Sequence, residues 1–279
     1  MTHPNNTSTF IHINMSVKSY HISKYRNQQT ITEDDFLAIE EPLEISVSYE
    51  VDGKRMQKPV SVTMRTPDHD RELALGFLFT EGIIHRYDEV KQVQTNVFDA
   101  NKIVVALQEG KVPAMAQLDR NFYTTSSCGI CGKSSIDAIH TKVEFSPQDV
   151  LAFDESILFT LQDKLLQQQR AFQKTGGIHA SALFDTQGHL LAFHEDVGRH
   201  NALDKLIGEA FVQGQIPLQQ HVLLLSGRAS FELIQKAAMA GIRVVAAVGA
   251  PSSLAADAAA QFGMKLYGFV KHDRYNCYT

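Results

Sequence analysis

The chain has 279 residues, of which 44% are hydrophobic and 20% are charged, and its 26 basic and 31 acidic residues give a net charge of −5. These values are ordinary for a globular protein and argue against a chain dominated by nucleic-acid binding. No apolar run approaches the roughly 18 residues that a membrane span requires, and the start of the chain lacks the basic and apolar regions of a signal peptide. We therefore expect a cytoplasmic protein that binds neither nucleic acid nor membrane.

The first part of the chain is predicted to form an extension followed by an α+β lobe. Residues 1–37 are rich in Asn, Thr, Ser, His and Gln, which predicts a poorly ordered extension or a single arm strand. A smaller N-terminal lobe is expected over residues 38–145. Its predicted elements are strands over 43–49, 60–64 and 102–107, a turn at Asp52-Gly53, and a helix over 66–82.

From about residue 150 helical and strand patterns alternate. Predicted helices cover 149–172, 201–211, 230–240 and 253–262, and predicted strands cover 179–184, 190–193, 222–225, 244–248 and 266–270. Alternation of this kind implies βαβ units and a sheet that helices cover on both faces. The sequence thus predicts an α/β lobe over residues 146–279.

Two of the three cysteines stand in the segment Ser127-Cys-Gly-Ile-Cys-Gly132, among serines and glycines. Small polar neighbours offer little apolar surface that could hold this segment in a core, so we predict a mobile loop. Lys133 and a predicted helix start next to Cys131 favour a thiolate over a thiol. These features are best explained by a thiolate that accepts a chemical group and transfers it to another molecule. The alternatives are an inert buried pair, a thioredoxin-type redox pair, and a zinc site completed by histidines or Cys277.

A second group of chemically active residues lies between His194 and Lys205, where seven side chains in twelve positions can ionise. One interpretation is a capped helix with structural ion pairs. The other is the floor of a polar pocket, in which Arg199 and Lys205 face anions while His194 or His200 moves protons or donates hydrogen bonds. His179 could join this pocket.

Two loops of small residues follow predicted strands and precede predicted helices. They are Ser226-Gly-Arg-Ala-Ser230 and Gly249-Ala-Pro-Ser-Ser253. Free backbone N–H groups at a helix start attract anions. Gly227 permits a close approach, Arg228 adds charge, and Ser230 can cap the helix or bond a phosphate. If both strands belong to one parallel sheet, both loops open on its carboxyl edge, where such folds bind ligands. Ordinary loops with serine caps are the alternative.

The end of the chain, Phe269-Val-Lys-His-Asp-Arg-Tyr275, mixes basic and aromatic residues. Lys271 and Arg274 beside aromatic rings suit a heterocycle that carries phosphate. A solvated tail is the alternative interpretation.

Several long sequence segments, which follow one another in the family's order, resemble the FdhD family, the sulfur carriers for formate dehydrogenase. They include Glu72 to Ile84, Ser127 to Gly132, Gly177 to Ala182, His194 to Lys205 and Ser226 to Ser230, and the resemblance covers about residues 38–279. It implies a sulfurtransferase that accepts persulfide sulfur from a cysteine desulfurase. The sulfur would pass to the molybdenum of the bis(molybdopterin guanine dinucleotide) cofactor of formate dehydrogenase, a bound substrate for which GDP would be a mimic.

The resemblance also implies a C-terminal domain layered like cytidine deaminase but without its zinc, and a homodimer. The persulfide falls on Cys128 and the second catalytic cysteine is Cys131. The family's cofactor-contacting segment falls on Phe269, Val270, Lys271, His272, Asp273 and Arg274. His272-Asp273 depart from the glycine-containing pattern expected there, which leaves Lys271 and Arg274 as the firmer contacts. With the loops and the polar cluster, the expected cofactor-binding residues also include Ser226, Gly227, Arg228, Ser230, His194 and Arg199.

Two other functions stay open from the sequence. The chain could be a chaperone that binds the molybdenum cofactor without covalent sulfur transfer, or a zinc-dependent hydrolase on a deaminase-like scaffold. The first would not need the cysteines as sulfur carriers, and the second would need stoichiometric zinc.

Overall fold

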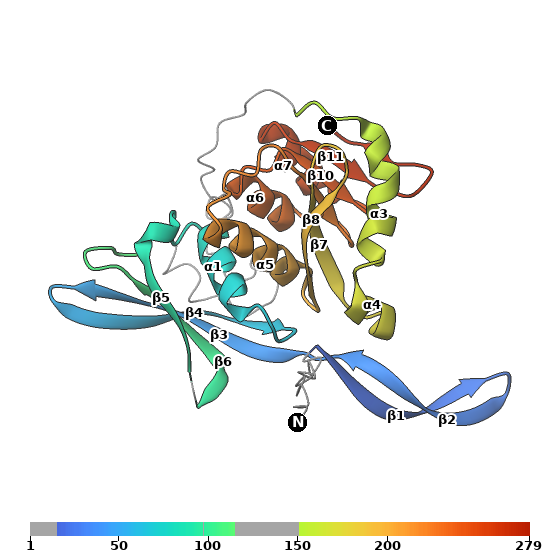
Figure 1. Cartoon of the computed structure of the whole chain (residues 1–279), viewed down its shortest axis with the longest axis horizontal. Helices are drawn as coiled ribbons and strands as arrows, with labels where there is room; N and C mark the ends of the chain where they lie inside the picture. The colour runs from blue at the N-terminus through green and yellow to red at the C-terminus, as the bar shows by residue number, and fades with distance from the viewer. Residues whose placement is uncertain (1–15, 97, 115–150) are drawn as a thin grey trace, which may run out of the picture.

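Three β-sheets and the helices that pack on them make up the structure, a computed structural model that describes residues 16–96, 98–114 and 151–279 (Figure 1). The mixed α/β class is as predicted. The likeness to cytidine deaminase and the lobe boundaries stay predictions. None of the helices in the described ranges combines the length and hydropathy needed to cross a membrane.

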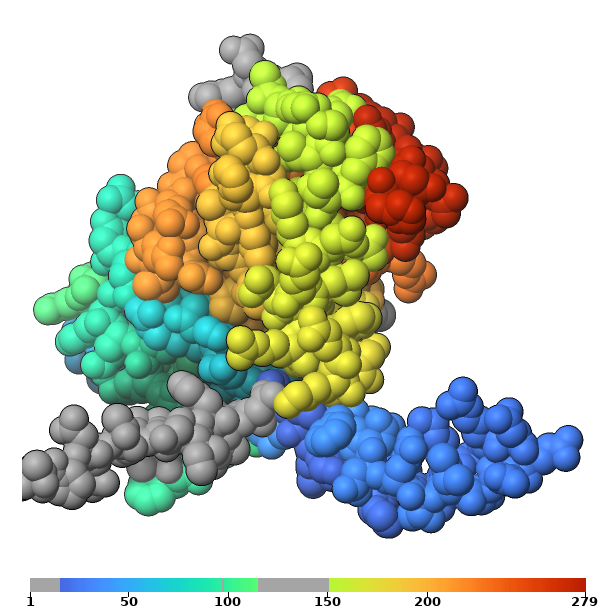
Figure 2. All heavy atoms as spheres, turned by 45° about the vertical axis from the view of Figure 1, so that its right-hand side comes forward, coloured from blue at the N-terminus to red at the C-terminus, as the bar shows by residue number. Residues whose placement is uncertain are grey.

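The first sheet is an exposed hairpin arm made of β1 (Val17–Arg26) and β2 (Gln29–Ala38), which projects from the body (Figures 1 and 2). The structure here differs from the expected poorly ordered or single-stranded extension. Asn27 and Gln28 turn the chain with positive φ angles of 52° and 61°, although Asn-Gln is a weaker turn signal than Asn-Gly. The strands carry cross-strand ion pairs, such as Lys24 to Glu33 at 2.6 Å, rather than a buried apolar face, so hydrophobic patterning did not reveal them.

The second sheet has four strands in the order β4-β3-β6-β5. They are β3 (Glu41–Val51), β4 (Lys54–Arg65), β5 (Val90–Asn96) and β6 (Asp99–Leu107), with η1 (Tyr87–Glu89) before β5. The predicted hairpin is confirmed, and Asp52 and Gly53 turn it with φ angles of 50° and 71°. Helix α1 (Asp70–Thr80) follows β4 as predicted. Strand β5 was missed because most of its residues are polar and exposed.

The third sheet has six strands in the order β12-β11-β10-β9-β7-β8. They are β7 (His179–Phe184), β8 (Leu190–Asp196), β9 (Val222–Leu225), β10 (Val244–Ala247), β11 (Lys265–Gly268) and β12 (Asn276–Cys277). Strands β9, β10 and β11 are parallel and are connected through α6 (Phe231–Met239) and α7 (Ser253–Gln261). The predicted run of alternating strands and helices is therefore confirmed.

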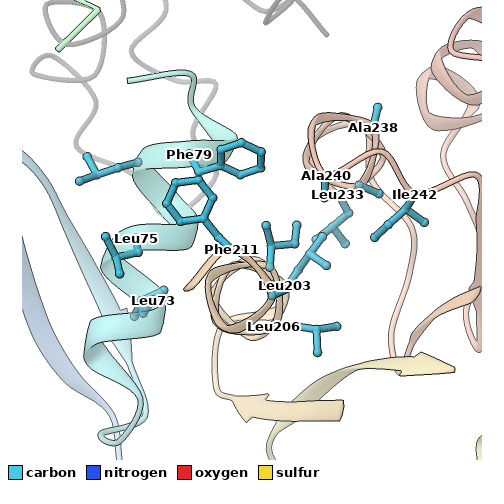
Figure 3. Close-up of a cluster of buried hydrophobic side chains, with 14 of the residues drawn as sticks. Leu73, Leu75, Phe79, Leu203, Leu206, Phe211, Leu233, Ala238, Ala240 and Ile242 are labelled. Atoms are coloured by element: carbon cyan, nitrogen blue, oxygen red, sulfur yellow. The ribbon is translucent and has the colours of Figure 1, made fainter. Parts of the chain in front are cut away.

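Helices cover both faces of this sheet. Leu223 and Leu225 of β9 belong to a large apolar cluster with α1, α5 (Arg199–Val212), α6 and α7. Val222 and Leu224 face the other way and pack with α3 (Leu158–Leu166) in a second cluster. Figure 3 shows the large cluster, where Phe79 of α1 lies against Phe211 of α5 with ring centroids 4.9 Å apart. Since this cluster also contains residues of the four-stranded sheet, the two predicted lobes share one core.

The helix predicted over 149–172 is wrong as a single element. The described chain instead forms η3 (Glu155–Ile157), α3 and α4 (Arg170–Thr175), and Gln169 between α3 and α4 has a non-helical ψ of 74°. The carboxylate of Glu195 accepts hydrogen bonds from the backbone N–H groups of Ala171 and Phe172 at 3.2 and 3.0 Å. A cap supplied by a strand 24 residues later therefore starts a new helix, which local periodicity could not show.

Candidate anion-binding site

Three loops lie side by side at the carboxyl ends of β9, β10 and β11. The N–H of Gly249 donates to the carbonyl of Gly227 at 2.9 Å, and the N–H of Phe269 donates to the carbonyl of Gly249 at 3.1 Å. A Cβ at Gly249 would lie 3.0 Å from backbone atoms of Gly227 and Arg228, so any larger residue would push these two loops apart by a few tenths of an ångström. The predicted adjacency of the loops after β9 and β10 is confirmed, and the C-terminal segment joins them.

The segment Phe269–Arg274 leaves the sheet through a tight turn. Phe269 has a left-handed φ of 55°, while the buried Val270 donates its N–H to Ala247 of β10 at 3.1 Å. The N–H of Lys271 donates to the carbonyl of Arg274 at 2.8 Å, which closes the turn around His272 and Asp273. Neither of these two residues has a positive φ. The turn therefore forms without the glycine that the family pattern led us to expect.

His179 stands at the start of β7 directly against the first loop. A Cβ at Gly227 would lie 3.2 Å from Nδ1 of His179. Burial lowers the pKa of His179, and the nearby positive charge of Arg199 lowers it further. The imidazole is therefore neutral at pH 7, and it can donate one hydrogen bond and accept another.

Two cavities meet at His179. The first has a volume of about 280 Å³ and is walled by Leu165, Phe172, Ile178, Ser226 and Val248. It is mainly apolar, as expected of a place for a ring. The second has a volume of about 200 Å³ and is lined by Arg199, His200, Asn201, Thr63 and Met64. It lies at the start of α5, where backbone N–H groups and a guanidinium favour an anionic group.

Arg199 and His200 give the second cavity its electrostatic character. The Nε atom of Arg199 is buried, and it has no hydrogen-bond partner within the described ranges. Burial lowers the pKa of His200 to about 3, and the charges of Lys236 and Arg199 add to that shift. His200 Nε2 lies 3.4 Å from the hydroxyl of Ser230, which does not cap its own helix. Arg199 makes no ion pair with the described side chains, but Glu40 lines the same cavity, so an anion placed here would meet both a guanidinium and a carboxylate.

Some residues of the polar cluster from His194 to Lys205 form structural ion pairs, and others line a pocket, so each of the two predicted roles applies to part of it. Nζ of Lys205 lies 2.7 Å from Asp196 and donates to the carbonyl of Thr66 at 2.8 Å, and both charged side chains are almost fully buried. The expectation that Lys205 faces an anionic ligand is therefore wrong, because its ammonium group is paired with the carboxylate of Asp196 inside the protein. Arg199 and His200 do line a cavity.

His194 lies in a different environment from the three loops. Its Nε2 is 2.7 Å from Oε2 of Glu209 in α5, and its ring meets that of His69 edge-on at 4.5 Å. The hydrogen bond from His194 lowers the pKa of Glu209. These contacts place His194 between β8, α5 and the start of α1, so its assignment to the cofactor site stays a prediction without a described contact to the loops.

The predicted sulfur site, Cys128 and Cys131, lies outside the described residues. Its mobility and its thiolate character stay predictions. Cys277 is exposed, and its Sγ donates to the carbonyl of Thr279 at 3.1 Å. Within the described ranges no group of three or more His, Cys, Asp or Glu side chains is placed to hold a metal ion, and the zinc alternative stays untested because it depends on the two cysteines.

The apolar wall of the first cavity was not expected from the sequence. Leu165 and Phe172 were predicted only as members of an amphipathic helix. Their place beside Ser226 depends on the packing of α3 and α4 across the sheet, and the sequence carries no local signal for that contact. His179 did carry a signal, since it follows two glycines at the start of a predicted strand.

The protein has a mixed α/β fold, and its three loops lie at the carboxyl edge of the parallel strands, where folds of this kind bind ligands. The model of the FdhD/NarQ family matches residues 38–279, and the chain belongs to this family. It is 45% identical over 269 residues to the sulfur carrier protein FdhD of Streptomyces avermitilis, with 92% of each chain covered. It is 48% identical over 262 residues to the protein of that name from Mycobacterium tuberculosis, covering 90% of this chain and 92% of the relative.

A solved structure shares the fold. It is the crystal structure of a candidate formate dehydrogenase accessory protein from Desulfotalea psychrophila, with a TM-score of 0.73 and 22% sequence identity. The match covers 94% of this chain and 97% of that one. At 22% sequence identity this similarity is evidence of a shared fold alone.

Proposed function

We propose that this chain is a sulfur carrier that serves the maturation of formate dehydrogenase. The observation that carries the proposal is its 45% and 48% identity, over nine-tenths of the chain, to relatives named sulfur carrier proteins. Cys128 would accept sulfur from a cysteine desulfurase and pass it to the molybdenum of a bound bis(molybdopterin guanine dinucleotide) cofactor. The transfer makes the protein a sulfurtransferase with a persulfide intermediate.

The proposed chemistry needs a nucleophilic thiolate and a leaving thiolate. The Cys128 thiolate attacks the outer sulfur of the desulfurase persulfide, and the desulfurase cysteine leaves as a thiolate. Attack by Cys131 on the inner sulfur of the Cys128 persulfide then releases the outer sulfur as hydrosulfide. A Cys128–Cys131 disulfide remains, which a thiol reductant must reopen. This cycle requires a reducing compartment, in keeping with a cytoplasmic location.

The three loops support the binding half of the proposal. A guanine ring would occupy the cavity beside His179 and Ser226, whose apolar walls include Phe172 and Val248. Phosphate groups would meet Arg228, Lys271 and Arg274 around the loops. Arg199 at the second cavity offers a further positive charge. A homodimer, as the family resemblance implies, would bring two such sites to one cofactor with two guanine nucleotides.

Mass spectrometry tests the covalent half of the proposal. The protein is incubated with a cysteine desulfurase and L-cysteine, and the intact mass is measured with and without a thiol reductant. We expect a gain of one sulfur atom that the reductant removes. Cys128→Ala should lose this gain, while Cys277→Ala should keep it. Equal sulfur loading of Cys128→Ala and the wild-type protein would refute the assignment.

A cofactor chaperone without covalent sulfur transfer is the second candidate. It is favoured by one observation, that the three binding loops belong to a part of the chain remote in sequence from the cysteines. In a strain that lacks its own copy of this protein, the Cys128→Ala/Cys131→Ala double variant separates the two functions. Restored formate dehydrogenase activity would favour the chaperone, and its absence, with GDP binding intact, would favour sulfur transfer.

A further inference from the structure

Glu155, in the short helix η3 that precedes α3, accepts a hydrogen bond on each of its carboxylate oxygens. The hydroxyl of Tyr267 donates to Oε1 at 2.6 Å, and the hydroxyl of Tyr275 donates to Oε2 at 2.6 Å. Glu155 is exposed to solvent, and the two short charge-assisted hydrogen bonds restrain the orientation of its carboxylate. The hydrogen bond from Tyr267, followed by that from Tyr275, lowers the pKa of Glu155. Glu155 is therefore ionised at pH 7.

The two tyrosines belong to different parts of the C-terminal segment. Tyr267 is fully buried in β11, whereas Tyr275 follows directly on Arg274. Their rings meet edge-on at 5.3 Å, and the ring of Phe159 in α3 lies 5.5 Å from that of Tyr275. Figure 2 shows the segment that contains α3 in contact with the C-terminal segment. The start of α3 is thus attached to both sides of the turn that carries Lys271 and Arg274.

This turn has one anchor at each end. At its start, Val270 is buried and bonded to Ala247 of β10. At its end, the anchor is Tyr275, whose hydroxyl reaches Glu155. Between the anchors, the backbone bond from Lys271 to Arg274 keeps the turn closed. The backbone after Tyr275 is also held, because β12 pairs with β11 through Asn276 and Cys277. The hydrogen bond to Glu155 adds a side-chain restraint on Tyr275, the residue that directly follows Arg274.

We propose that Glu155 is a positioning residue for ligand binding, which acts through Tyr275 to hold the Lys271–Arg274 turn in the orientation that meets the anionic substrate. The proposal rests on the function proposed above, because it assigns the turn to that same site. Glu155 itself does not touch the ligand. Its effect is to order the two cations before binding, so that the ligand does not have to order them.

Hydrogen exchange in the ligand-free protein tests the structural step alone. Tyr275→Phe removes one hydroxyl and keeps the ring packing, and Glu155→Gln removes the charge of the acceptor. We expect the Lys271 amide to exchange at least several-fold faster in both variants. Tyr278→Phe is the matched control, because its hydroxyl contacts only Asn276, at 3.4 Å, among the described side chains. Unchanged exchange at Lys271 in both variants would overturn the proposal.

A double-mutant cycle with GDP tests the functional step. Tyr275→Phe should weaken GDP binding by about threefold to tenfold, as expected when a preordered contact must be ordered on binding. In a Lys271→Ala/Arg274→Ala background the same substitution should have no further effect, because it acts through those side chains. An equal loss in both backgrounds would overturn the positioning role. Failure of the wild-type protein to bind GDP would instead overturn the ligand assignment. The exchange rates separate that outcome from a failure of Glu155 and Tyr275 to hold the turn.

Discussion

Replacing Gly208 with alanine tests how closely α5 packs on α1. A Cβ at residue 208 would lie 1.9 Å from the carbonyl oxygen of Glu72 and 2.7 Å from its carbonyl carbon. Ordinary van der Waals contact begins near 3.4 Å, so the two helices would have to separate by about 1.5 Å. Gly76 on α1 makes the reciprocal contact, where a Cβ would lie 1.9 Å from the carbonyl oxygen of Asp204.

The energy of this separation can be bounded. Overpacking of a core by one methyl group costs about 1–3 kcal/mol, and the upper end applies here because both opposing groups are backbone. Alanine regains about 0.8–1 kcal/mol through its helix propensity. The expected net loss is about 2 kcal/mol in the free energy of unfolding. For a chain of this size, that loss lowers the melting temperature by about 4–8 °C.

Thermal and urea unfolding of Gly208→Ala and the wild-type protein measure this loss. Gly177→Ala is the matched control, because its Cβ would meet only the carbonyl of Thr175 at 3.7 Å. The control should stay within about 0.5 kcal/mol of the wild type. A Gly208→Ala protein as stable as the wild type, or more stable, would refute the close packing of the two helices.

The remaining predictions concern buried charge and pH. Lys205→Met should destabilise the fold by about 3–5 kcal/mol in urea unfolding, since it leaves the carboxylate of Asp196 buried without its partner; a loss under 1 kcal/mol would contradict that ion pair. With a folded pKa of about 3 against 6.5 for its ordinary value, His200 is protonated only in the unfolded state between these pH values. The free energy of unfolding should therefore fall as pH drops below 6.5, by about 1.4 kcal/mol per pH unit from this group. His200→Gln should remove that part of the slope between about pH 6 and 4, and identical slopes in the two proteins would refute it.

Local patterning predicted the elements whose apolar residues form a regular run or alternation in the sequence. Alternating or continuous apolar runs marked β3, β9 and β10, and each lies within a residue or two of its expected place. Parallel alignment then followed from the alternation of strands and helices, and with it the adjacency of the loops at Gly227 and Gly249. This part of the site could be predicted because topology alone brings the carboxyl ends of neighbouring parallel strands together.

Features that depend on contacts between distant residues could not be predicted in this way. The break between α3 and α4 depends on Glu195, a residue of β8. The sequence shows that Lys205 is charged but not that Asp196 neutralises it in the core. The two hydrogen bonds to Glu155 come from Tyr267 and Tyr275, which lie more than 100 positions away in the sequence. In each case a residue that is in contact only in the folded protein decides the role of the side chain. The neighbouring sequence does not reveal which residue that is.

Calorimetric titration with GDP tests most directly whether the three loops form the binding site for an anionic nucleotide. The titration compares the wild-type protein with Arg228→Ala and Lys271→Ala at one fixed salt concentration. Lys102→Ala serves as a control on the four-stranded sheet, where that lysine pairs with Asp99. We predict that the wild type and the control bind GDP equally, and that each loop variant binds it about tenfold more weakly, as expected for the loss of one charge-assisted contact. Equal affinity in all four proteins would contradict the assignment of the site to these loops.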